Sequence, residues 1–218
     1  MIEPVEQRAA RIAGFLYVLT NATAILAFSI RGRLLVRGDA AQTAKKILAS
    51  TNLFRLGVVF ELITIGEVIA LVGALYVALR RVSPGLAFTA VLWRVAENVI
   101  LAYVVMNELA ALRLATTTPA LAQTFLGLYG DGFRIGFFFL GLGSAMFAYL
   151  FFKSRYIPRT LAVIGIVGSL LMAIAELSIM ACPDLSRVIG MSYMAPIGIF
   201  EIVGGFWLLF MGIRVKEQ

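Results

Sequence analysis

Nine ionisable side chains lie within otherwise apolar stretches of this chain: Arg55, Glu61, Glu67, Arg94, Glu97, Glu108, Arg134, Glu176 and Glu201. A charged side chain that faces lipid costs from about 2.5 to above about 10 kcal/mol, so these residues should face one another or water. Six of the nine are acids and three are bases, so ion pairs cannot neutralise them all. The surplus carboxyl groups must be protonated, hydrated or bound to a cation.

The spacing within residues 86–112 indicates a polar stripe along one helix. At about 100° per residue, a single arc of about 100° holds Arg94, Glu97, Asn98 and Glu108. Tyr103 and Asn107 are predicted to point away from this arc. Arg94 and Glu97 are three residues apart, which allows an ion pair within the helix. The stripe should therefore face the protein interior.

Residues 53–79 carry a second set of polar side chains. Glu61, Thr64 and Glu67 spread over about 120° of helix, roughly opposite Arg55. Because Arg55 lies near the start of this helix, its long side chain can reach the membrane interface.

This pattern favours a polar cavity, open at the outer face and closed at the inner face, that binds a cation, a proton or a small polar ligand. Glu67 and Glu97 would be its deep acids, and Arg94 would hold Glu97 charged. Glu61 and Glu201 would stand at its entrance. The other candidates to line it are Asn98, Glu108, Glu176, Arg55 and Arg134. Two alternatives stay open: charged pairs that only hold helices together, and catalysis by paired carboxylates.

Two absences narrow the chemistry further. The chain has no histidine, which excludes imidazole general bases and histidine-ligated metals. Its one cysteine, Cys182, permits neither an internal disulfide nor a thiolate cluster. We therefore assign no catalytic residue and no metal ligand, and the sequence does not identify a cofactor.

The composition places these residues in a membrane protein. Of the 218 residues, 61% are hydrophobic and only 14% are charged, whereas a soluble domain has about 45–50% and about 25%. Six stretches are long enough to cross a bilayer: 12–30, 53–79, 86–112, 132–152, 161–181 and 196–213. The sequence thus predicts an all-α, polytopic bundle of six transmembrane helices. No linker divides the chain, so we expect residues 1–218 to form a single membrane domain.

Basic residues predict the orientation of the spans. Nine lie on the face with the two termini: Arg8, Arg11, Arg80, Arg81, Lys153, Arg155, Arg159, Arg214 and Lys216. Seven lie in the longer loops of the other face: Arg31, Arg33, Arg37, Lys45, Lys46, Arg113 and Arg187. The denser face should be cytoplasmic, so both termini are predicted to be inside. The net charge of +7 thus indicates contact with lipid headgroups, with no nucleic-acid partner.

The first outer loop is predicted to contain a short helix. Residues 40–48 would place Ala41, Ala44, Ile47 and Leu48 on one face, with Asp39 as the N-cap. The helix is interpreted either as an interfacial lid over the cavity or as a solvated connection between two spans.

Five stretches resemble a bacterial membrane-protein family catalogued as a domain of unknown function, number 4386. They are Arg11–Thr20, Arg37–Ser50, Phe54–Gly57, Lys153–Gly165 and Pro196–Gly212. Arg55 and Glu201 fall where the family pattern carries the same residues. The resemblance implies six helices in a bacterial cytoplasmic (inner) membrane, and it implies no activity.

Three functional classes follow from these observations. The first is a protein that binds or transports a small cationic or proton-coupled ligand. The second is a non-catalytic accessory subunit that binds a lipid or cofactor within a larger complex. The third is a membrane enzyme that acts on a lipid or isoprenoid. The expected partners are membrane lipids and either a second copy of the chain or another membrane protein.

Overall fold

The computed structural model describes residues 3–36 and 39–213, and within them the chain is helical with no strand. The elements are α1 (Pro4–Leu34), α2 (Ala40–Ala49), α3 (Thr51–Leu79), α4 (Pro84–Leu114), α5 (Pro119–Ser154), α6 (Arg159–Ala181), α7 (Leu185–Ile189), the 3₁₀ helix η1 (Ser192–Met194) and α8 (Ala195–Met211). Three of the basic residues used for orientation, Arg37, Arg214 and Lys216, lie outside the described residues.

The predicted number and order of spans are confirmed. In the described part of the chain, six segments are long and apolar enough to cross a membrane: α1, α3, α4, α5, α6 and residues 192–211. The helices extend further than the apolar stretches do; α5, for example, begins at Pro119 and not near residue 132. Hydropathy marks only the part that crosses hydrocarbon, whereas proline at the first helical position sets where the helix begins.

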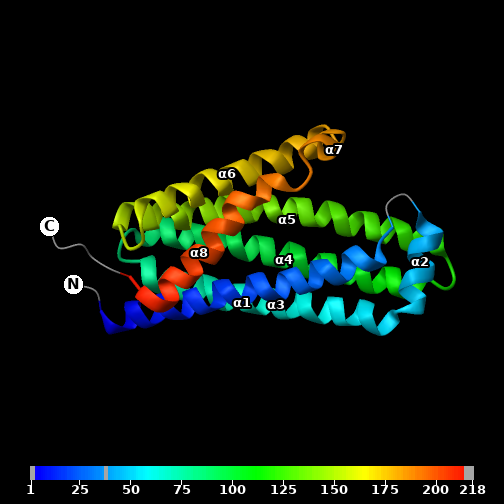
Figure 1. The fold of residues 1–218 in the computed structure, drawn as a ribbon, viewed down its shortest axis with the longest axis horizontal. Coiled ribbons are helices and arrows are strands. Elements are labelled where there is room, and N and C mark those ends of the chain that lie inside the picture. The colour runs from blue at the N-terminus through cyan, green and yellow to red at the C-terminus, as the bar shows by residue number, and fades with distance from the viewer. Residues whose placement is uncertain (1–2, 37–38, 214–218) are drawn as a thin grey trace.

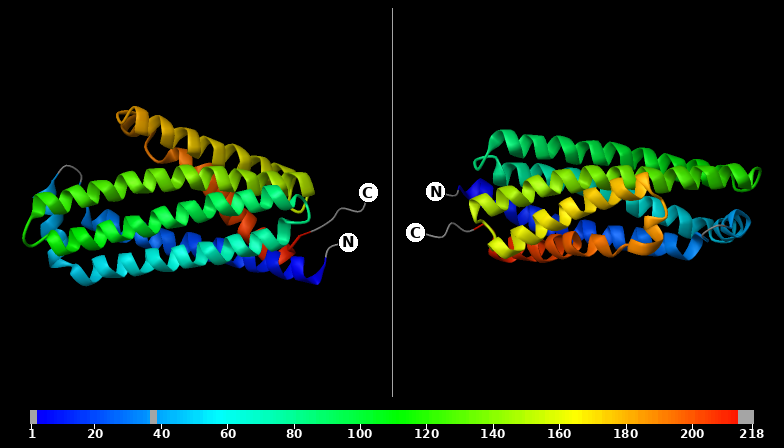
Figure 2. Two further views of the ribbon diagram at one scale, coloured as in Figure 1. Left: turned by 180° about the vertical axis from the view of Figure 1, so that it is seen from behind. Right: turned by 90° about the horizontal axis from the view of Figure 1, so that it is seen from above.

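The six long helices lie side by side along the bundle (Figures 1 and 2), and their contacts form a closed ring. Each packs against the next along the chain, and α8 returns to pack against α1. Successive helices run in opposite directions, so the chain begins and ends at the same end of the bundle. There the backbone N–H of Ile213 donates to Gln7 Oε1 at 3.0 Å. We call this the terminal end, and the opposite one, which carries α2, the α2 end.

Small residues allow the ring to close between α1 and α8. A methyl group on Gly14 would lie 2.6 Å from the carbonyl oxygen of Gly205, and one on Gly205 would lie 2.9 Å from Tyr17 Cβ. The two backbones are therefore in direct contact, as is typical of helix pairs in membranes. On α6, Gly168 lies against the backbone of α8 at Ile197, and Gly165 makes room for the Phe200 ring.

The half of the bundle nearest the terminal end is filled with apolar side chains. They include Leu71, Leu75, Leu79, Phe147, Leu150, Phe151 and Leu208, all at most 2% exposed. At the surface of this end, Arg81 Nε lies 2.7 Å from Glu6 Oε1 and so ties the loop after α3 to α1. Partial burial, and then the Glu6 carboxylate, raise the pKa of the nearby Tyr156. This half therefore contains a packed, apolar core.

The short helix α2 covers the opposite end of the bundle (Figure 1). Asp39 caps it as predicted, because its Oδ1 accepts from the Gln42 N–H at 2.8 Å. Of the predicted apolar face, Ala44 and Ile47 are buried, whereas Ala41 and Leu48 are exposed. Ile47 packs into a small core with Leu34, Phe54 and Val105. A fully solvated connection is therefore wrong, since one side of α2 is part of the protein core.

The contact between α1 and α8 gives the first prediction. Gly14→Ala should destabilise the protein by about 1–3 kcal/mol, because the added methyl group meets backbone atoms that cannot move aside. The matched control is Gly73→Ala in α3, where the new methyl group would have open space. Thermal unfolding in detergent measures both. Equal melting temperatures for the two variants would contradict the close packing of α1 and α8.

Candidate functional site

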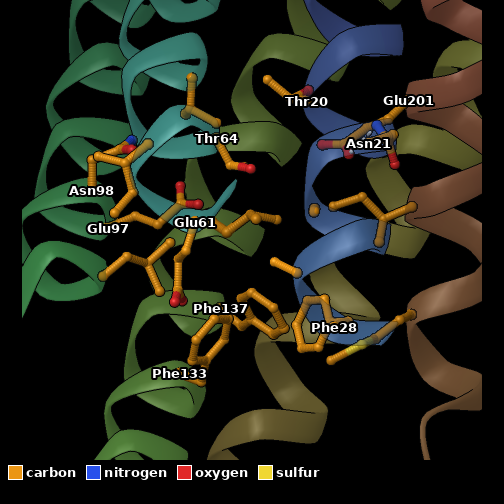
Figure 3. Close-up of a pocket in the computed structure, with 18 of the residues that line it drawn as sticks. Thr20, Asn21, Phe28, Glu61, Thr64, Glu97, Asn98, Phe133, Phe137 and Glu201 are labelled. Carbon is orange, nitrogen blue, oxygen red and sulfur yellow. Dashed lines mark hydrogen bonds between the residues drawn. The ribbon is translucent and has the colours of Figure 1, made fainter. Parts of the chain in front are cut away.

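A central cavity of about 210 Å³ lies within the ring of helices. Its polar lining comes from α1, α3, α4 and α8 and consists of Thr20, Asn21, Arg31, Glu61, Thr64, Arg94, Glu97, Asn98 and Glu201. Its apolar lining includes Phe28, Phe133, Phe137, Leu140, Met172 and Ile197. The volume is sufficient for several water molecules or one small organic molecule. Figure 3 shows Asn21 and Glu201 on one wall, with Glu97 and Asn98 on the other.

Five of the ten candidate residues line this cavity: Glu61, Arg94, Glu97, Asn98 and Glu201. The other five lie elsewhere: Arg55, Glu67, Glu108, Arg134 and Glu176. The sequence thus identified the charged residues but could not tell which of them line the cavity and which lie at other places in the bundle. Those places are defined by contacts between helices, which spacing along one helix does not determine.

The cavity wall formed by α4 contains the predicted ion pair. Arg94 Nη1 lies 3.0 Å from Glu97 Oε2 and donates to Ser144 Oγ at 3.3 Å. Asn98 Nδ2 donates to the Arg94 carbonyl oxygen at 2.7 Å. Gly143 of α5 makes room for this arrangement, because a methyl group there would lie 2.8 Å from Arg94 Cγ. The arginine side chain is thereby held between α4 and α5.

The opposite wall contains Glu201, whose carboxyl group has a weaker hydrogen-bond partner than the carboxylate of the α4 ion pair has. Asn21 Nδ2 lies 3.4 Å from Glu201 Oε2 and donates at a shorter distance, 2.9 Å, to the Tyr17 carbonyl oxygen. Among the ion pairs of residues 3–36 and 39–213, none includes Glu201. This half-buried carboxyl group is therefore left with a neutral amide as its hydrogen-bond donor.

Several buried oxygen atoms of the cavity lining have no hydrogen-bond donor. In the described structure these are Glu61 Oε1, Asn98 Oδ1 and Glu97 Oε2, the last of which still faces the Arg94 charge. One donor of the lining, Arg31 Nη1, likewise lacks an acceptor. Leaving a buried polar atom unsatisfied costs about 1–3 kcal/mol. Two lining oxygens, Glu61 Oε1 and Asn98 Oδ1, are therefore open to a hydrogen-bond donor such as water or an N–H group of a ligand.

Arg31 is the functional residue that the sequence analysis missed. It was assigned to an outer loop, but α1 continues one turn past residue 30 and buries this side chain to 5% exposure. Its Nη2 donates to Glu108 Oε2 at 2.7 Å and pairs with Glu61, and its guanidinium lies 4.6 Å from the centre of the Tyr129 ring. Helical spacing could have identified it, since Arg31 lies on the same face of α1 as Thr20 and Ala27, which also line the cavity.

Two more acids are held outside the cavity. Glu176 accepts from Arg134 Nη1 at 3.3 Å and from the Tyr193 hydroxyl at 2.6 Å, which binds η1 to α6. Glu67 accepts from Thr23 Oγ1 at 2.8 Å, and Thr64 in turn donates to Thr23 at 2.8 Å. Glu67 is thus connected to the cavity lining through two hydroxyl groups.

The prediction that Tyr103 and Asn107 both point outward is half right. Tyr103 is 57% exposed, but Asn107 is only 3% exposed. The buried arc of α4 is wider than its polar stripe, because α4 packs against both α3 and α5.

The fold and the cavity together define a multi-pass helical membrane protein with a polar interior. Within that class, the chain belongs to the family described as Domain of unknown function (DUF4386), whose model matches residues 12–212. The expected family is thereby confirmed. Neither a curated protein nor a solved structure matches the chain.

The buried cluster of Arg31, Glu61 and Glu108 gives the second prediction. Arg31→Met should lower the free energy of unfolding by about 3–5 kcal/mol, because it leaves two buried carboxylates without a cation. Arg33→Met is the matched control, since Arg33 lies in the same turn of α1 but is exposed. Adding Glu61→Gln and Glu108→Gln to Arg31→Met should restore part of the loss. Thermal unfolding measures the stability of each variant. If Arg31→Met and Arg33→Met lowered the free energy of unfolding equally, the stabilising role of the cluster would be contradicted.

Proposed function

We propose that this protein binds a small organic cation with N–H groups in the central cavity. The observation that carries this proposal is a set of acceptors in the lining: within the described residues, Glu61 Oε1 and Asn98 Oδ1 have no donor, and the Glu201 carboxylate has no basic partner. An alkylammonium group supplies up to three donors and one positive charge, and so fits these acceptors. A neutral polar ligand would supply donors but not the charge.

The charges around the cavity support a cation. Three acids line it, Glu61, Glu97 and Glu201, against the two bases Arg31 and Arg94. Arg31 is shared with a further acid, Glu108, which lies just outside the lining. With all of these groups ionised, four carboxylates face two guanidinium groups. The cavity therefore attracts a positive ligand and repels an anion.

The apolar lining supports an organic ligand with a hydrophobic portion. Phe28, Phe133 and Phe137 form an aromatic cluster, with ring centres 5.4 Å apart for the first pair and 5.2 Å apart for the second. Phe28 is 38% exposed and so connects the cavity with the protein surface. Ligand pockets commonly combine such an apolar wall with a few polar groups that orient the ligand. The cation would have its charge near Glu201 and Glu97 and its apolar part against these rings.

We place the protein in the bacterial cytoplasmic membrane with the terminal end inside, by the positive-inside rule. The cavity would then be reached from the outer side, and the apolar core near the terminal end would block the inner side. Transport of the bound cation would require that core to open. The hydroxyl chain from Thr64 through Thr23 to Glu67 favours exchange of a proton during such a step.

Binding of 2-phenylethylammonium gives the third prediction. Calorimetry on the purified protein should show that it binds at least about tenfold more tightly than neutral 2-phenylethanol, a difference of about 1.4 kcal/mol, and that phenylacetate does not bind. Trimethylation of the ammonium group, which removes its N–H donors, should also weaken binding.

The matched variants are Glu201→Gln and Asp131→Asn. Glu201→Gln should weaken binding of the ammonium ligand by about tenfold, because it removes the carboxylate that has no basic partner. Asp131 is an exposed acid of α5 outside the cavity, and its variant should bind as the wild type does. Equal affinities for the cation and the neutral alcohol would contradict the proposal, as would an unchanged affinity in Glu201→Gln.

A further inference from the structure

A second hollow lies on the outer surface of the bundle, apart from the central cavity. It has a volume of about 580 Å³ and runs between α3 and α4 near the α2 end. Arg55 and Arg113 stand in its lining together with Val59, Leu62, Leu109 and Leu112. We call it the α3–α4 groove. It shares no lining residue with the central cavity.

The charge of this groove is positive and uncompensated. Both guanidinium groups are exposed, and neither forms an ion pair in the described part of the chain. The groove lining contains no carboxylate. Arg55 was predicted to lie opposite Glu61 and Glu67 on its helix, and it does. The prediction that it lines the central cavity is wrong, however, because it lies in the groove instead. Within residues 3–36 and 39–213, neither arginine therefore has an anionic partner.

The rest of the groove is apolar and faces the surroundings of the bundle. Val59 is 47% exposed, Leu62 is 49% exposed and Leu109 is 38% exposed, all on membrane-spanning helices. Arg55 is in the second turn of α3 and Arg113 is in the last turn of α4, so both lie where these helices leave the hydrocarbon. The groove thus has two cations at headgroup level and an apolar floor that runs toward the membrane centre.

We propose that the α3–α4 groove binds an anionic phospholipid, with the phosphate between Arg55 and Arg113 and an acyl chain along Val59, Leu62 and Leu109. Guanidinium groups bind phosphate oxygens through two parallel hydrogen bonds, which suits recognition of a phosphodiester. Basic pockets between membrane helices bind acidic lipid headgroups by the same means. The apolar floor selects a lipid over free phosphate, because only a lipid covers it. This site does not depend on the proposed cation site.

Native mass spectrometry tests the proposal. Protein is reconstituted into phosphatidylcholine vesicles with or without phosphatidylglycerol, extracted gently, and scored for retained lipid. Wild-type protein should retain phosphatidylglycerol in preference to phosphatidylcholine, and the double variant Arg55→Gln, Arg113→Gln should retain at least about tenfold less of it. The matched control is Arg33→Gln, Arg187→Gln, which removes the same charge from exposed positions outside the groove.

A third variant, Val59→Trp, fills the apolar floor without changing charge, and it should reduce lipid retention as well. Equal losses in the two double variants would mean non-specific attraction to the membrane and would overturn the proposal. Retention that is lost with the arginines but unaffected by Val59→Trp would overturn the groove as the site. Thermal unfolding in pure phosphatidylcholine should be the same for all variants, because every altered side chain is exposed.

Discussion

The structure depends on one constraint: a charged side chain within the hydrocarbon has to meet a partner or water inside the protein. Arg31 of α1 meets Glu61 of α3 and Glu108 of α4, and Arg134 of α5 meets Glu176 of α6. Arg94 of α4 contacts Ser144 of α5. Polar contacts therefore link five consecutive spans and determine which face of each turns inward. The last span, α8, is joined to α1 and α6 mainly through glycine contacts, and Glu201 is its charged contribution to the interior.

The division of the bundle into an apolar half and a polar half explains where a ligand can bind. Near the terminal end, leucine and phenylalanine side chains fill the ring and leave no room for a hydrated group. Beyond Tyr17 and Leu71 the lining becomes polar, and the helices enclose a cavity in place of a core. The acids that line this cavity outnumber its bases, which is the reason for proposing a positive ligand. The proposed cation would supply the charged partner that Glu201 lacks among the described residues and would connect α8 to α4.

The sequence predicted the elements of this structure better than their assembly. Hydropathy located six spans, and helical spacing predicted the Arg94–Glu97 pair and the inward stripe of α4. Arg31 was missed because hydropathy ends a span at the first charge, whereas the helix continues and buries that charge against two acids. The separation of Arg134 and Glu176 from the cavity depends on which helices are neighbours. Spacing along a single helix does not contain that information.

The central claim is that the interior of the ring is wet and selects cations. Its most direct test is the rate of cysteine modification at Thr20, which lines the cavity, in a protein whose native Cys182 is replaced by serine. If the interior selects cations, Thr20→Cys should react at least about tenfold faster with 2-aminoethyl methanethiosulfonate, a cation, than with the anionic 2-sulfonatoethyl reagent, relative to the same ratio at an exposed cysteine. Equal relative rates for the two reagents would contradict cation selectivity. No reaction with either would show that the interior is dry.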